Sequence, residues 1–137
     1  MGKIILITGA SSGMGKETAL QLIKEGHIVY GAARRVESMK ELVDNGGHAI
    51  KMDVTNEETI KQGVEQLIQE QGKIDILINN AGYAIYGAVE DTSMEDARRQ
   101  FELNIFGLAR LTQLVLPHMR KRLSDTMFDR IIMSQVK

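Results

Sequence analysis

The feature that most constrains this chain is a short apolar run, residues 4–7, followed at once by the glycine-rich segment TGASSGMG at residues 8–15. Apolar side chains then recur between Ala19 and Ile23 with the spacing of a helix face. A buried strand, a tight turn and a helix in this order predict the start of a β-α-β unit, in which a helix connects two parallel strands.

The glycines of this turn have separate roles. Gly9 permits the tight bend, Gly13 lets the backbone approach a pyrophosphate, and Gly15 lets the helix pack close to its strand. Backbone N–H groups at the start of the helix then point toward the anion, which the helix dipole also attracts. The predicted phosphate-binding residues are Gly9, Ser11, Ser12, Gly13, Met14 and Gly15.

Strands and helices alternate along the rest of the chain. Strands are predicted at residues 3–8, 27–33, 48–52 and 75–78, and helices at 13–24, 36–44, 56–72 and 93–120. Asn56 and Ser93 are the expected N-caps of the last two helices. Right-handed crossovers between parallel strands then give a doubly wound α/β sheet of strand order 3-2-1-4. Residues 1–122 form one domain in this interpretation, followed by a tail at 123–137.

The end of the second strand predicts which dinucleotide the sheet binds. Ligands of such sheets bind beyond the carboxyl ends of the strands. An NAD-selective site usually has a carboxylate here for the ribose hydroxyls, but this chain has Ala33 followed by Arg34 and Arg35. Guanidinium groups bind phosphate through charge-assisted hydrogen bonds. The pattern favours NADP over NAD, although two arginines at the start of a surface helix can also be simply solvated.

Two further strand ends carry candidate cofactor residues. Asp53 can accept a hydrogen bond from the adenine amino group while Val54 packs on the ring, or Asp53 can serve only as a turn residue before the next helix. After the fourth strand, Asn80, Ala81 and Gly82 allow the backbone to run beside the ribose. A simple strand-terminating turn is an equally good interpretation of that second segment taken alone.

These motifs in combination resemble the short-chain dehydrogenase/reductase family over residues 1–122. The resemblance rests on TGASSGMG, DVT at 53–55, NNAG at 79–82 and Asn104 within FELNIFG. It implies a Rossmann-type fold, NAD(P)-dependent hydride transfer on a small alcohol or carbonyl substrate, and a homo-oligomer formed through the long helix. Asn104 matches the family's catalytic Asn, which supports a water-linked proton relay. The implied cofactor contacts are Gly9, Ser12, Gly13, Met14, Arg34, Asp53, Val54, Asn80, Ala81 and Gly82.

One part of the family's pattern is missing. Family members use a Ser and a Tyr-x-x-x-Lys motif, but Tyr30, Tyr83 and Tyr86 are followed four positions later by Arg, Gly and Glu. Loss of a positioned general acid costs about 10²–10⁴-fold in rate. We therefore expect the 137-residue chain to be inactive by itself. Two functions stay open: an NADP-dependent oxidoreductase, and a non-catalytic dinucleotide-binding or dimerisation module.

The tail has two interpretations. Residues 130–134 are suited to a fifth strand, with Ser134 near the expected catalytic Ser, although the family's strand carries two more residues before that Ser. Alternatively, Ser124 caps an amphipathic helix with Met127, Phe128, Ile131 and Ile132 on one face. The sequence favours the helix. The fourth strand would then be an exposed edge, which promotes association.

Composition excludes several kinds of site. The chain has no cysteine, so a disulfide, a Cys-ligated zinc and a thiol nucleophile are impossible. Its three histidines are scattered, and we expect no metal site. The formal net charge is -1, with Lys and Arg spread along the chain, so we expect no nucleic-acid partner. No stretch reaches the ~18–20 apolar residues of a membrane span, and we expect a cytoplasmic protein.

Overall fold

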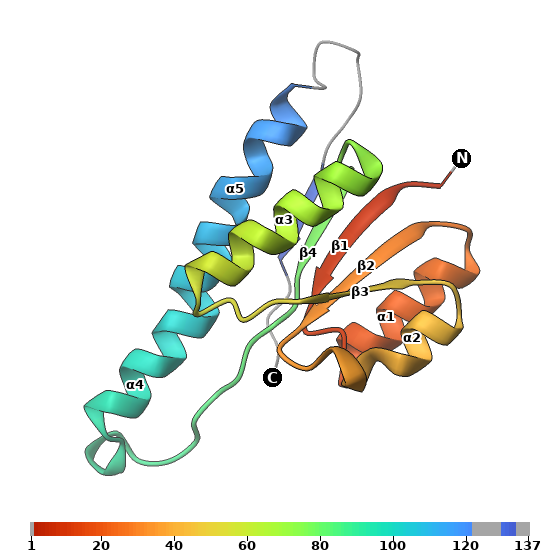
Figure 1. Ribbon diagram of the computed structural model, residues 1–137. Helices are drawn as coiled ribbons and strands as arrows, with labels where there is room; N and C mark the ends of the chain where they lie inside the picture. Colours follow the sequence, from red (N-terminus) through yellow and green to blue (C-terminus); the bar gives the residue numbers. More distant parts are fainter. Residues whose placement is uncertain (1, 122–129, 134–137) are drawn as a thin grey trace.

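A computed structural model describes residues 2–121 and 130–133 of the chain. Its centre is a parallel sheet of strand order β3-β2-β1-β4-β5 (Figure 1). The strands are β1 (Ile4–Thr8), β2 (Ile28–Ala33), β3 (His48–Lys51), β4 (Ile76–Asn79) and β5 (Arg130–Met133). The predicted α/β class and the order 3-2-1-4 are confirmed, and a fifth strand extends the sheet beyond β4.

Helices cover both faces of the sheet because the side chains of β1 alternate between two apolar cores. Ile5 and Ile7 pack with residues of α1 and α2, whereas Leu6 packs with residues of α3 and α5. Every residue of β1 is buried, as expected for the central strand of a doubly wound sheet. The helices are α1 (Gly13–Lys24), α2 (Lys40–Asp44) after the 3₁₀ turn η1 (Val36–Met39), α3 (Glu57–Gln71), α4 (Met94–Phe101) and α5 (Leu108–Arg120).

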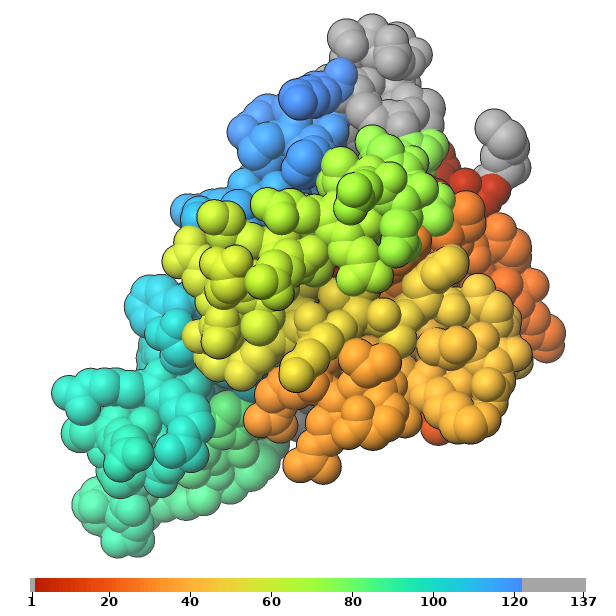
Figure 2. Space-filling model, viewed as in Figure 1, coloured from red at the N-terminus to blue at the C-terminus, as the bar shows by residue number. Residues whose placement is uncertain are grey.

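The long helix predicted at residues 93–120 is present, but its hydrogen-bonding pattern changes in the middle. The segment η3 (Glu102–Gly107) is π-helical and connects α4 to α5. Gly107 lies directly against the β3–α3 loop, where a Cβ would collide with the backbone carbonyl of Val54. Figure 2 shows the α4 end projecting beyond the rest of the molecule.

The tail corrects one expectation from the sequence. Residues 130–133 pair in parallel with β4, so the fifth-strand alternative is right for them and the favoured amphipathic helix is wrong. An apolar run of this length fits either element, and the unpaired N–H and C=O groups along β4 decide in favour of the strand. The fourth strand is therefore not an edge. Ser124 and Ser134 lie outside the described residues.

Within the described residues, no helix combines the length and the apolar character that a membrane span requires.

Candidate functional site

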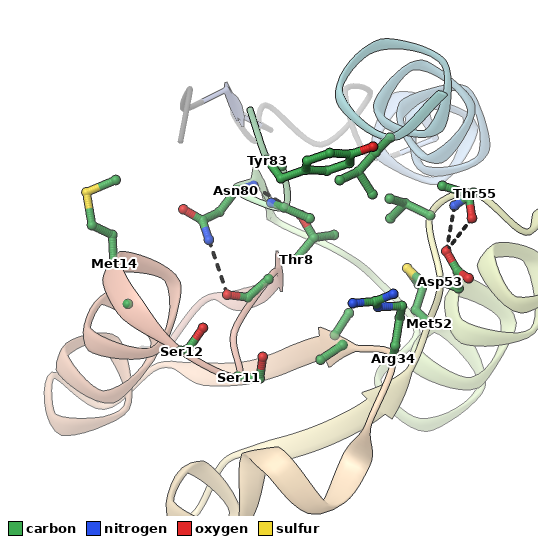
Figure 3. Close-up of a pocket in the computed structure, with 18 of the residues that line it drawn as sticks. Thr8, Ser11, Ser12, Met14, Arg34, Met52, Asp53, Thr55, Asn80 and Tyr83 are labelled. Atoms are coloured by element: carbon green, nitrogen blue, oxygen red, sulfur yellow. Dashed lines mark hydrogen bonds between the residues drawn. The ribbon is translucent and has the colours of Figure 1, made fainter. Parts of the chain in front are cut away.

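A cavity of about 1060 Å³ opens at the carboxyl ends of the strands (Figure 3). It lies where the connections of β1 and β4 leave the sheet in opposite directions, which is where doubly wound sheets bind ligands. Most of the residues predicted to bind a cofactor line it. These are Gly9, Ser11, Ser12, Gly13, Met14, Arg34, Asp53, Val54, Asn80, Ala81 and Gly82. The structure does not place Gly15, Arg35 or Asn104 in its lining.

The glycine turn has the conformation that its residue types predict. Gly9 and Gly13 have φ angles of 67° and 56°, in the left-handed region that favours glycine. A Cβ on Gly13 would meet nothing within 4 Å, so the absence of a side chain leaves the backbone open to the cavity. Gly15 lies beneath the turn instead, where a Cβ would collide with the carbonyl of Gly9 and the side-chain amide of Asn80.

The first turn of α1 differs from those of α3 and α4. The Asn56 side chain caps α3 by accepting hydrogen bonds from the backbone N–H groups of Glu58 and Thr59, and Ser93 Oγ caps α4. Both helices also have acidic residues in their first turns. The Ser12 side chain makes no capping hydrogen bond, and the first turn of α1 has no acidic residue. The positive end of α1 therefore faces the cavity without compensation from its own side chains.

A buried hydroxyl joins the two strand ends that form the cavity wall. Thr8, at 3 % exposure, accepts hydrogen bonds through Oγ1 from the backbone N–H groups of Asn80 and Ala81, both at 3.0 Å. The Asn80 side-chain amide donates to the carbonyl of Gly9 at 3.2 Å. Sequence reasoning gave Thr8 no role, because its partners lie more than 70 positions along the chain. Thr8 and Asn80 lie side by side in Figure 3.

The two arginines after β2 have different positions. Arg34 lines the cavity, and its side chain extends into it (Figure 3). Arg35 is exposed and precedes η1, and it is not among the residues that line the cavity. The carboxyl end of β2 therefore presents one guanidinium to a ligand.

Asp53 is a turn residue, which is one of the two roles that the sequence left open, and it also lines the cavity. Its Oδ1 accepts hydrogen bonds from the backbone N–H of Thr55 at 2.9 Å and from the Thr55 hydroxyl at 2.6 Å. Its carbonyl accepts from the backbone N–H of Asn56, which leads the chain into α3. Asp53 is thus a turn residue that also lines the cavity beside Val54.

Asn104 holds the segment that follows β4. Its Oδ1 accepts a hydrogen bond from the backbone N–H of Tyr83 at 3.0 Å, and its Nδ2 donates to the Tyr83 carbonyl at 2.6 Å. One turn earlier, Gln100 Oε1 accepts from the backbone N–H of Ile85 at 2.7 Å. Both side-chain groups of Asn104 are therefore used in positioning this loop. Gln100 was missed from the sequence, although its spacing of four from Asn104 places it on the same helix face.

The cavity also has lining residues outside the set predicted to bind the cofactor. Helix α4 and segment η3 contribute Arg99 and Leu103, again four residues apart, and the loop after β4 contributes Tyr83. Of these, Leu103 packs against the buried core beneath α3 and α5. Leu103 lies four residues before Gly107 and eight before the buried Leu111, which places it on the inward face of the helix.

Comparison with known proteins gives a consistent result. Residues 3–126 match the family model described as short chain dehydrogenase. Over 121 residues the chain is 48% identical to the 3-ketodihydrosphingosine reductase of Bacteroides thetaiotaomicron. This alignment covers 87% of this chain and 43% of the reductase.

Solved structures share the fold. A short-chain dehydrogenase from Streptomyces avermitilis aligns with a TM-score of 0.91 and 38% identity, over 97% of this chain and 49% of its own. The structure of a 3-ketoacyl-(acyl-carrier-protein) reductase from Brucella melitensis, complexed with NADH, aligns with a TM-score of 0.92 and 29% identity. This alignment covers 96% of this chain and 56% of the reductase chain. Another neighbour, from Pseudomonas aeruginosa, is a complex with NADP. The chain spans about half of the length of these proteins.

Proposed function

Because this chain belongs to the short-chain dehydrogenase family, we propose that it is the cofactor-binding part of an NADP-dependent oxidoreductase that interconverts an alcohol and a carbonyl compound. When bound, the reduced cofactor NADPH would supply a hydride to the carbonyl compound, and NADP⁺ would accept one from the alcohol. The residues of this chain bind and orient the dinucleotide, and the domain that does so comprises residues 1–122.

One observation carries this proposal: three different strand ends present complementary groups to a single cavity. The uncapped first turn of α1 offers backbone N–H groups to a pyrophosphate, and the open space at Gly13 lets the anion approach them. Arg34 offers a cation, and Asp53 offers a carboxylate to the adenine amino group. The anion site at α1, the cation of Arg34 and the hydrogen-bond acceptor of Asp53 together fit a phosphorylated adenine dinucleotide.

The choice of NADP over NAD rests on Arg34, since neighbours in the family include complexes with each cofactor. The end of β2 has no carboxylate to repel a 2′-phosphate, and a hydrogen bond to a charged group contributes about 1.5–3 kcal/mol. We expect the chain to bind NADP at least about tenfold more tightly than NAD.

Calorimetric titration of the two cofactors tests this expectation. Arg34→Asp should reverse the preference, because the new carboxylate repels the 2′-phosphate and accepts from the ribose hydroxyls. Arg35→Asp is the matched control, since it makes the same charge change outside the cavity and should preserve the preference. Equal affinities of the unmodified chain for NADP and NAD would remove the argument from Arg34.

A ketone is the substrate class best supported. The relative from Bacteroides thetaiotaomicron is named as a ketone reductase, and small residues at Ala81 and Gly82 leave space beside the cofactor. The 137-residue chain by itself should not oxidise NADPH, because none of its tyrosines is followed by Lys at the fourth position. Turnover of any ketone by a sample of verified mass would contradict that expectation.

A non-catalytic role in association is the second candidate. Three apolar side chains of the long helix are about half exposed: Phe101 at 53%, Ile105 at 48% and Phe106 at 59%. Exposed apolar patches favour protein contacts, so we propose a homo-oligomer through this helix, in the cytoplasm. Sedimentation of the chain distinguishes the cases: a monomer at high concentration would refute the association.

A further inference from the structure

A second arginine, Arg99, lines the cofactor cavity. Arg99 and Arg34 belong to elements that lead to helices on opposite faces of the sheet. Arg34 leads from β2 into η1 and α2, which cover one face of the sheet. Arg99 lies on α4, whose continuation α5 packs on the other face. Both arginines line the cavity. The cavity is therefore lined by one arginine from the end of β2 and by one from α4.

The position of Arg99 over the cavity is fixed by packing along its helix. Gly107 contacts the carbonyl of Val54 so closely that no side chain would fit between them. One turn earlier, Leu103 lines the cavity and packs against the core that contains Val54 and Met52. Arg99 follows one further turn out on the same face. The face of the helix that contacts the β3–α3 loop at Gly107 therefore continues through Leu103 to Arg99, and both of these residues line the cavity.

The charge of Arg99 is only weakly used within the protein. Its side chain is 60% exposed, and its guanidinium lies 3.5 Å from Glu95 Oε1 and 3.6 Å from Asp96 Oδ1. Both partners lie on the same helix and are themselves exposed. Exposed pairs of this kind contribute about 0–1 kcal/mol. Little free energy is therefore lost when the guanidinium turns from these carboxylates toward a ligand.

Resting on the proposed function, we infer that Arg99 covers the adenine ring of the bound dinucleotide. The phosphate groups already have their partners at the first turn of α1 and at Arg34. The same cavity is also lined by the apolar residues Met52, Val54 and Leu103 and by Asp53, from the β3–α3 connection and from the helix that carries Arg99. That combination suits a flat ring with an amino group at its edge. A planar guanidinium stacks on the face of such a ring.

Arg99→Gln tests this assignment, with Arg98→Gln as the matched control. The two arginines are neighbours on α4 and both are exposed, but Arg98 does not line the cavity. Each variant is titrated calorimetrically with NADP, NAD and ADP-ribose, which has the adenine ring but no nicotinamide. Circular dichroism spectra and thermal melts verify that the variants are folded.

The adenine ring is common to all three ligands, so Arg99→Gln should lower the binding affinity for each by about fivefold, as expected for loss of one stacked cation. The ratio of the NADP affinity to the NAD affinity should stay unchanged. Arg98→Gln should bind all three as the unmodified chain does. A loss confined to NADP would place Arg99 on the 2′-phosphate and overturn the inference, as would unchanged binding of every ligand. In both cases tight NADP binding by the unmodified chain would still support the proposed function.

Discussion

Replacement of Thr8 by Val tests whether a single buried hydroxyl holds the cavity wall together. Valine has nearly the shape of threonine, so the change leaves no cavity but removes the acceptor of two backbone hydrogen bonds, each 3.0 Å long. The N–H of Asn80 is buried, and loss of its partner costs about 1–3 kcal/mol. The N–H of Ala81 is partly open to water, so loss of its hydrogen bond to Thr8 costs about 0.5–1.5 kcal/mol. We expect a total destabilisation of about 1.5–4.5 kcal/mol.

Urea unfolding followed by circular dichroism measures this difference, with Thr8→Ser as the control. Serine keeps the hydroxyl and removes only a methyl group, which should cost no more than about 1–1.5 kcal/mol. Amide exchange should also become faster at Asn80 and Ala81 in the valine variant. A valine variant within about 0.5 kcal/mol of the unmodified chain, with both amides still protected, would refute the idea that this hydroxyl connects the strand ends.

Three further changes test other parts of the structure. Gly15→Ala should lower the melting temperature and abolish cofactor binding, because its Cβ collides with backbone beneath the turn; calorimetric titration and a thermal melt measure both. Gln100→Leu should accelerate amide exchange at Ile85, which loses its acceptor, while the melting temperature changes little. The Tyr30 hydroxyl donates to Glu70 at 2.5 Å and holds the pKa of that carboxylate below its usual value. This bond stabilises the protein above the ordinary carboxyl pKa and is lost as pH falls through the lowered one. Tyr30→Phe should therefore lower the melting temperature at pH 7, by an amount that shrinks below about pH 4.

Local patterns predicted the elements that form the cavity. Glycines with positive φ and an apolar run before them are short-range features, and so the turn at residues 8–15 was placed correctly. The same holds for Arg34 and Asp53, which follow strands whose carboxyl ends meet at one edge of the sheet. Sequence patterns predicted the wrong secondary structure where contacts with residues far along the chain decide it. Residues 130–133 fit a helix or a strand by pattern alone, and pairing with β4 decides between them.

The middle of the long helix shows the same limit. Apolar periodicity continues through residues 93–120, so nothing in the pattern signals the π-helical segment. The contact between Gly107 and the Val54 carbonyl joins residues far apart in sequence. The sequence likewise did not predict the contacts of Asn104, because its side chain hydrogen-bonds the backbone of Tyr83, 21 positions away. The resemblance identified the residue, and the structure shows the loop that it positions.

These contacts imply that the cavity is held in shape before any cofactor binds. The segment after β4 is fixed from one side by Thr8 and from the other by Gln100 and Asn104. All of these residues lie within the described part of the chain, so the binding wall does not depend on the missing catalytic motif. Cofactor affinity and catalysis should therefore separate: this chain should bind NADP without turning over a ketone. Loss of binding in a chain whose Asn80 and Tyr83 amides remain protected from exchange would show that a fixed wall is insufficient.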